Sequence, residues 1–217
     1  MIFLKSHLKI GKCFKYLLIF GSFLIFNCSR NPKEKHLALQ AYSSFNLEFC
    51  DNIASSLHSI YGCKVSILSP KEIPKSTFVN SKSPRYRADK IIKILKDQKP
   101  DSIDFIMGLT NRDISTTKKD ENGNTLKPIS KYQDWGIFGL GYRPGSSSVV
   151  SSFRFSNVNR EKFLERLKKI CTHELGHNLG LKHCPNKNCV MTDAAETIKT
   201  IDNVQLKLCK ECRRILY

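Results

Sequence analysis

The feature that most constrains this chain is the run from His173 to His183, in which histidine, glutamate and glycine recur at fixed intervals as HExxHxxGxxH. His173 and His177 are four residues apart, so on a helix both imidazoles lie on one face and can bind the same metal ion. Gly180 predicts the end of that helix, because only glycine enters the left-handed conformation at low cost. The turn would bring back His183 as a third ligand. The run therefore predicts a helix, a tight turn and a metal site in succession.

Three histidine nitrogens suit zinc and leave one tetrahedral position open for water, which is typical of a catalytic site. Glu174 is not placed to bind the same ion beside both helical histidines. It can instead hydrogen-bond a water on the zinc, remove its proton and pass that proton to the leaving amine of a peptide. Glu196 is an alternative third ligand, since some HExxH proteases use a downstream glutamate. His183 is preferred because Gly180 supplies the required turn.

Four cysteines follow directly, as the pairs Cys184/Cys189 and Cys209/Cys212. Two short-spaced pairs separated by an intervening segment predict a closed four-thiolate zinc site. Two disulfides are the alternative in an exported protein. Zinc is preferred because a CxxC pair forms a disulfide mainly in redox proteins, and no thioredoxin-like pattern surrounds this one. The two motifs together predict two zinc ions, one catalytic and one structural.

With Met191 included, residues 173–212 read HExxHxxGxxHCx4CxMx17CxxC, which resembles the archaemetzincin signature at every spacing. The resemblance implies a zinc peptidase in which Met191 forms a Met-turn, an apolar floor beneath the three histidines. It also implies a metzincin-like mixed twisted sheet with packed helices, a long active-site helix and a small zinc-stapled C-terminal subdomain. The resemblance continues more loosely upstream, through residues 86–89 and the strand expected over 135–142.

Upstream of the motif, helical and strand patterns alternate, which predicts an α/β fold. Helical spacing of apolar residues predicts helices over about 50–61, 88–95 and 159–175. Apolar runs predict strands over 37–42, 63–68, 103–109, 135–142 and 149–155, with the strand at 103–109 central. Polar, turn-rich residues 111–133 predict a long surface loop. An extended substrate is expected to lie along an edge strand at 135–142.

The first 27 residues carry four lysines and no acidic residue, and end in an apolar run too short to cross a bilayer. This pattern predicts a secretory signal, and Cys28 directly after it resembles the lipidated cysteine of a bacterial lipoprotein. The expected organisation is a lipoprotein-like signal peptide at 1–27, a tether at 28–36 and an archaemetzincin-like catalytic domain at 37–217. That domain would divide into an upper part at 37–180 and a C-terminal subdomain at 181–217. The protein is expected to be exported and lipid-anchored to a bacterial membrane, facing the periplasm or the exterior; the cytoplasm is the alternative.

The chain is strongly basic, with 36 Lys and Arg against 19 Asp and Glu and a net charge of +17. The basic residues are spread along the chain without the Arg–aromatic clusters of a nucleic-acid groove, so nucleic acid is not an expected partner. The expected partners are a peptide or protein substrate and, through the lipid anchor, a membrane; the oligomeric state stays open. The alternative function is a catalytically silent, basic, zinc-stabilised binding protein on a metzincin frame, and the intact Glu174 argues against it.

Overall fold

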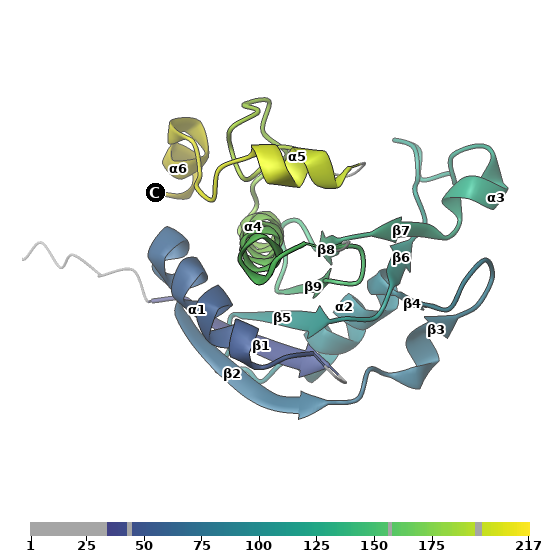
Figure 1. The fold of residues 1–217 in the computed structure, drawn as a ribbon, viewed down its shortest axis with the longest axis horizontal. Helices are drawn as coiled ribbons and strands as arrows, with labels where there is room; N and C mark the ends of the chain where they lie inside the picture. The colour runs from purple at the N-terminus through teal and green to yellow at the C-terminus, as the bar shows by residue number, and fades with distance from the viewer. Residues whose placement is uncertain (1–33, 43–44, 156–157, 194–196) are drawn as a thin grey trace, which may run out of the picture. The chain divides into compact units, whose positions relative to one another are not determined.

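The computed structural model describes residues 34–42, 45–155, 158–193 and 197–217. The expected signal peptide, Cys28 and most of the expected tether lie outside these residues. The described residues form two sheets and the helices that pack on them (Figure 1). Within the described part of the chain, no helix combines the length and the apolar character needed to cross a bilayer.

The larger sheet has five strands and positions the site. In spatial order they are β2 (Lys64–Lys71), β1 (His36–Tyr42), β5 (Phe105–Thr110), β9 (Ser147–Ser151) and β8 (Gly139–Gly141). The first four are parallel to their neighbours, whereas β8 is antiparallel to β9. The prediction of a mixed α/β sheet with β5 in its centre is therefore confirmed, and β8 is an edge strand.

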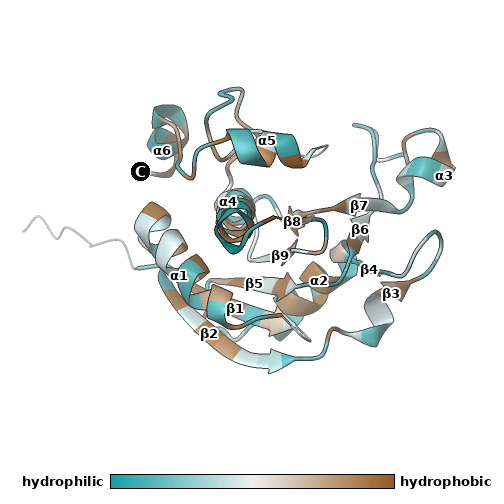
Figure 2. Cartoon of the chain, in the orientation of Figure 1, coloured by the Kyte–Doolittle hydropathy of each residue, from teal (hydrophilic) through white to brown (hydrophobic). Residues whose placement is uncertain are grey.

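Helices cover each face of this sheet. Alternate residues of a strand point to opposite faces, and the apolar side chains on both faces are buried beneath these helices. Leu37 and Leu39 of β1 belong to the core cluster beneath α1 (Glu48–Tyr61) and α4 (Arg160–Asn178). Ala38 lies between them and belongs to the second cluster, beneath α2 (Ala88–Gln98). Figure 2 shows the hydrophobic residues along β5 and α2. The helix α4 is thus fixed on one face of the sheet, near its β8 edge.

The smaller sheet corrects two predictions. It has four strands: β3 (Phe78–Val79), β4 (Arg85–Arg87), β6 (Ile114–Thr116) and β7 (Trp135–Ile137). The single strand expected over 135–142 is wrong, because β7 pairs with β6 and β8 pairs with β9, so the chain changes sheets at Phe138. The expected loop at 111–133 contains β6, whose Ile114 is fully buried, and the short helix α3 (Ile129–Tyr132). Strand pairing between distant segments decides both points, and local periodicity does not record it.

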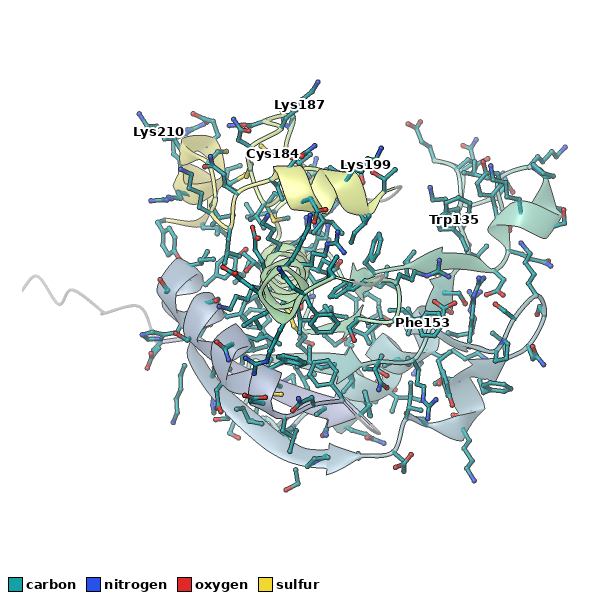
Figure 3. The ribbon with its side chains drawn as sticks, in the orientation of Figure 1. Trp135, Phe153, Cys184, Lys187, Lys199 and Lys210 are labelled. Carbon is teal, nitrogen blue, oxygen red and sulfur yellow. The ribbon has the colours of Figure 1, made fainter. Side chains whose placement is uncertain are left out.

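The C-terminal segment carries α5 (Ile198–Asn203) and α6 (Lys210–Leu216). The nearly buried Arg166 of α4 donates hydrogen bonds of 2.7 Å to both carboxylate oxygens of Asp202, which joins α5 to α4. This pairing holds the pKa of Asp202 at about 2. Figure 3 shows Lys187 and Lys210 extending outward from this segment. The remaining described element is a short 3₁₀ helix at Lys75–Thr77.

Candidate active site

The helix α4 presents the first two histidines as predicted. Its start is fixed by Asn159, whose side-chain oxygen accepts a hydrogen bond of 2.9 Å from the Lys162 backbone N–H. It runs for 19 residues and places His173 and His177 on the face that looks into a cleft. The turn after the helix passes through Gly180, whose φ of +99° is a left-handed conformation that favours glycine.

The three histidines lie close together: each offers one candidate ligand nitrogen, and these three nitrogens lie within 4.8 Å of one another. The Nε2 atoms of His177 and His183 lie 3.2 Å apart. Zn–N bonds of about 2.1 Å in a tetrahedron place two nitrogens about 3.4 Å apart, so the spacing suits zinc. Glu196, the alternative third ligand, lies outside the described residues. Among the described residues, Asp193 lies beside the third histidine, with its Oδ2 3.5 Å from His183 Nδ1.

Backbone carbonyls orient the two helical imidazoles. The Nδ1 atoms of His173 and His177 lie 2.8 Å from the carbonyl oxygens of Val190 and Leu181. A carbonyl oxygen can only accept, so each Nδ1 carries the proton and each Nε2 presents a lone pair. Burial lowers the pKa of His173 to about 3, and burial also lowers the pKa of His177, so both rings are neutral. Neutral imidazoles with free Nε2 lone pairs are the form that binds a metal.

Glu174 lies beside the histidines, against the edge strand β8. Its residue is only 6% exposed, and burial raises the pKa of the carboxyl group to about 8. A Cβ atom on Gly139 would lie 2.5 Å from the carboxylate Oε1, so only glycine leaves room for this side chain. No local pattern marks Gly139 in the sequence, because only the folded chain brings it to Glu174.

Met191 packs beneath the same helix. Its side chain is fully buried, and its sulfur would lie 2.3 Å from a Cβ atom on Gly176. The glycine inside HExxH therefore allows the methionine to approach the helix backbone between the two helical histidines. Position and burial agree with the apolar floor that the resemblance implies for Met191.

The four cysteines of the second motif also come together, with all sulfurs within 4.8 Å. The Sγ atoms of Cys184 and Cys209 are 3.7 Å apart, and those of Cys189 and Cys212 are 3.8 Å apart. Zn–S bonds of about 2.3 Å in a tetrahedron separate neighbouring sulfurs by about 3.8 Å. The sulfur spacing therefore fits a tetrahedral zinc site.

One thiol of this cluster is poised to ionise. Burial would raise the pKa of Cys209, but hydrogen bonds from the Cys212 backbone and from Cys184 lower it to about 7. The thiolate is the form that binds a metal. Three further cysteines lie outside the cluster as buried free thiols of the core: Cys50, Cys63 and Cys171.

Comparison with known proteins decides the family. The model of peptidase family M54 matches residues 36–217. The chain belongs to peptidase family M54. An archaemetzincin of Haloarcula marismortui is 32% identical over 170 residues, which cover 74% of this chain and 87% of the relative. This M54 member is therefore a zinc metallopeptidase that acts on peptide or protein substrates.

Solved structures share the fold. The crystal structure of an archaemetzincin from Methanopyrus kandleri is 25% identical with a TM-score of 0.69, and the match covers 87% of this chain and 96% of that one. The archaemetzincin of Archaeoglobus fulgidus, solved in complex with malonate, is 27% identical with a TM-score of 0.65. The match covers 82% of this chain and 98% of that one.

In this M54 peptidase, Asn178 fastens the edge strand to the active-site helix. Its side-chain amide donates hydrogen bonds of 2.9 Å to the carbonyl oxygens of Tyr142 and Ser147, on either side of the turn between β8 and β9. Asn178 is buried and directly follows His177. This role of Asn178 could not be predicted from its place inside the HExxHxxGxxH run, because its partners lie more than 30 residues away in the sequence.

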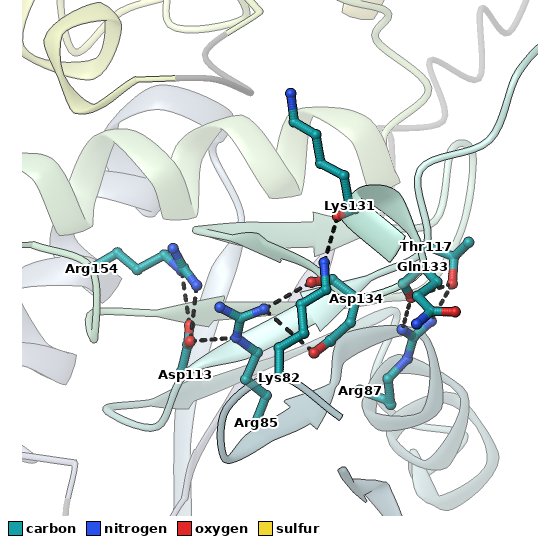
Figure 4. A network of polar contacts seen from close by, with 9 residues as sticks. All are labelled: Lys82, Arg85, Arg87, Asp113, Thr117, Lys131, Gln133, Asp134 and Arg154. Carbon is teal, nitrogen blue, oxygen red and sulfur yellow. Dashed lines mark hydrogen bonds and ion pairs between the residues drawn. The ribbon is translucent and has the colours of Figure 1, made fainter. Parts of the chain in front are cut away.

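A network of charged side chains holds the strand that leads into β8 (Figure 4). Asp113 accepts hydrogen bonds of 2.8 Å from both Arg85 and Arg154. The guanidinium of Arg154 lies on the backbone of β7, where a Cβ atom on Gly136 would be only 1.8 Å from it. Charge-assisted hydrogen bonds of this length are among the stronger ones in proteins.

Basic side chains also hold the segment just before β7. Three backbone carbonyls accept hydrogen bonds there: Lys131 from Lys82 at 3.0 Å, Gln133 from Arg87 at 2.8 Å and Asp134 from Arg85 at 2.8 Å. Because β7 is separated from β8 by Phe138 alone, these contacts help to set the position of β8 above Glu174.

Between β8 and α4 lies a cleft of about 420 Å³, the candidate active site. The three histidines and Glu174 line it. Its walls are largely apolar, from residues of β7, β8, α4, α5 and the segment between them: Ile137, Phe138, Leu140, Ile170, Val190, Ile201 and Val204. An apolar, partly closed cleft strengthens electrostatic interactions with a bound substrate.

Proposed function

We propose that this M54 peptidase hydrolyses peptide bonds with Glu174 as general base and with His173, His177 and His183 as ligands of a catalytic zinc. The observation that supports this proposal is that three imidazoles lie together beside the buried carboxyl group of Glu174. Two of the imidazoles are oriented by hydrogen bonds from Nδ1 to backbone carbonyls. When bound, zinc supplies a Lewis acid that polarises the scissile carbonyl and acidifies water. In its ionised form, which the positive charge of a bound zinc ion would favour, Glu174 removes the proton of the attacking water and delivers it to the leaving amine.

The substrate pairs with the edge strand β8. An edge strand has unpaired backbone groups on one side, and an extended peptide can add to it as a further strand. Gly139 and Gly141 have no side chains beyond hydrogen, so the backbone of β8 lies close to Glu174. A peptide paired with β8 would therefore lie near Glu174. The four-cysteine cluster is proposed to hold a second, structural zinc.

The third ligand can be tested directly. His183→Ala is expected to lower the zinc content from two ions per chain to one and to abolish hydrolysis of a blocked peptide, because two histidines bind zinc more weakly than three. Elemental analysis of the purified protein measures the first effect. Glu196→Ala is the matched variant and should keep both ions and the activity. The opposite pattern would assign the third ligand position to Glu196.

We also propose that the mature chain is exported and anchored through lipidated Cys28, on the strength of the N-terminal sequence alone. Bacteria that express the full chain with radiolabelled palmitate should incorporate label into the protein, and Cys28→Ser should abolish it. Cys13→Ser, inside the expected signal peptide, is the control and should keep the label. An unlabelled wild-type protein, or label that persists in Cys28→Ser, would contradict the anchor.

A further inference from the structure

The cleft carries more positive than negative charge. Lys118, Arg143 and Lys169 line it, against the carboxylates of Glu174 and Asp193. Glu174 is assigned to the reaction, and Asp193 lies beside His183. Among the described residues of the cleft, an anionic group of a substrate would therefore find more cations than anions.

Two of these three basic side chains already interact with other groups of the protein. The ammonium group of Lys169 is buried and lies 2.6 Å from Glu165 Oε1 and 3.2 Å from the carbonyl oxygen of Asp202. The ammonium group of Lys118 lies 4.5 Å from the centre of the Trp135 ring, a cation–π contact. Neither group is set up to bind a substrate carboxylate without giving up an existing contact.

Arg143 differs from both lysines. Its side chain is exposed, and among the described residues no carboxylate or carbonyl group accepts a hydrogen bond from its guanidinium. It is close to the reacting centre, since it lines the same cleft as the three histidines and Glu174. A guanidinium with free donors is shaped for bidentate binding of a carboxylate.

The position of Arg143 relative to β8 determines which part of a bound peptide it contacts. Gly139 and Gly141 of β8 both lie against Glu174, and Arg143 follows beyond the C-terminal end of that strand. Antiparallel pairing is the more stable arrangement of two strands. A peptide that pairs in this way with β8 has its scissile bond opposite residues 139–141, beside Glu174, and its residues N-terminal to that bond extend toward Arg143.

We propose that Arg143 is a specificity residue that recognises an aspartate or glutamate side chain on the N-terminal side of the scissile bond. This proposal rests on the proposed function, since it names the substrate class of the same cleft. Acidic peptides bind more tightly and are cleaved faster than neutral peptides of the same size, because a carboxylate completes the hydrogen bonding of Arg143.

The test uses two fluorescein-labelled peptides with blocked ends that differ only in glutamate or glutamine at the three positions N-terminal to a fixed Ala-Leu bond. Binding to the zinc-loaded Glu174→Gln protein is measured by fluorescence anisotropy, and cleavage by the wild type is followed by mass spectrometry. The glutamate peptide should bind on the order of tenfold more tightly, the size of one charge-assisted hydrogen bond. Adding Arg143→Gln should bring the ratio of the two dissociation constants close to one.

Arg112→Gln is the matched control, because Arg112 is exposed, carries the same charge and does not line the cleft. It should leave the ratio unchanged, which separates recognition by Arg143 from the general effect of a basic protein. Equal binding of the two peptides, or a preference that survives Arg143→Gln, overturns the proposal. Cleavage of both peptides at equal rates would overturn it while keeping the peptidase; tight binding of the glutamate peptide without cleavage of either would keep Arg143 and overturn the proposed function.

Discussion

Glu174→Gln is expected to lower kcat for peptide hydrolysis by a factor on the order of 10²–10⁴ while leaving the zinc content unchanged. That range is typical for the loss of one proton-transfer group. Glutamine has nearly the same size and shape, so it still fits against Gly139, but its amide cannot remove a proton from water. The buried position of the carboxylate beside the three histidines is the reason for expecting so large an effect.

The measurement compares initial rates on one blocked peptide with zinc per chain from elemental analysis. Glu161→Gln is the control, because Glu161 is an exposed carboxylate in the first turn of the same helix, far along the sequence from the histidines. It should keep nearly full activity. Hydrolysis close to the wild-type rate in Glu174→Gln, with zinc still bound, would remove Glu174 from the proposed mechanism.

The double variant Cys209→Ser/Cys212→Ser is expected to lower the zinc content toward one ion per chain, lower the melting temperature and reduce peptidase activity about 10- to 100-fold. Structural zinc binds to the folded state, so its binding free energy contributes to folding. The activity loss has the size seen when a group that orients a metal-binding histidine is displaced.

Hydrogen bonds connect the two clusters in this chain. The carbonyl oxygen of Val190 orients His173. The backbone N–H of Val190 in turn donates to the carbonyl of Lys207 at 3.1 Å, two residues before Cys209. A second connection runs from the backbone N–H of Cys184 to the carbonyl of Met191 at 2.8 Å. Release of Cys209 would therefore loosen the backbone that holds the first histidine.

Elemental analysis, a thermal melt and the peptidase assay together check this expectation. Cys63→Ala is the matched control, because Cys63 is a buried free thiol outside both clusters. This variant should keep both zinc ions and the activity, even if loss of the buried sulfur lowers the melting temperature slightly. Full activity in the double variant, or a Cys209–Cys212 disulfide in active wild-type protein, would contradict the coupling.

The sequence by itself determined the elements that depend on local spacing. The interval between His173 and His177 matches one turn of a helix, and Gly180 takes the left-handed conformation at the end of that helix. The central position of β5 was also predictable, because a strand buried on both faces is continuously apolar. In each case the signal lies within a few residues of the feature, so the amino-acid order is sufficient.

Only the tertiary structure decided which distant segments meet at the site. The division of residues 135–142 between two sheets follows from pairing with Ile114 on one side and Val149 on the other. The approach of Gly139 to Glu174 and the position of Arg143 in the cleft also require the folded chain. The physical reason is that strand pairing and close packing depend on which surfaces come into contact in space, and neither leaves a periodic pattern in the local sequence.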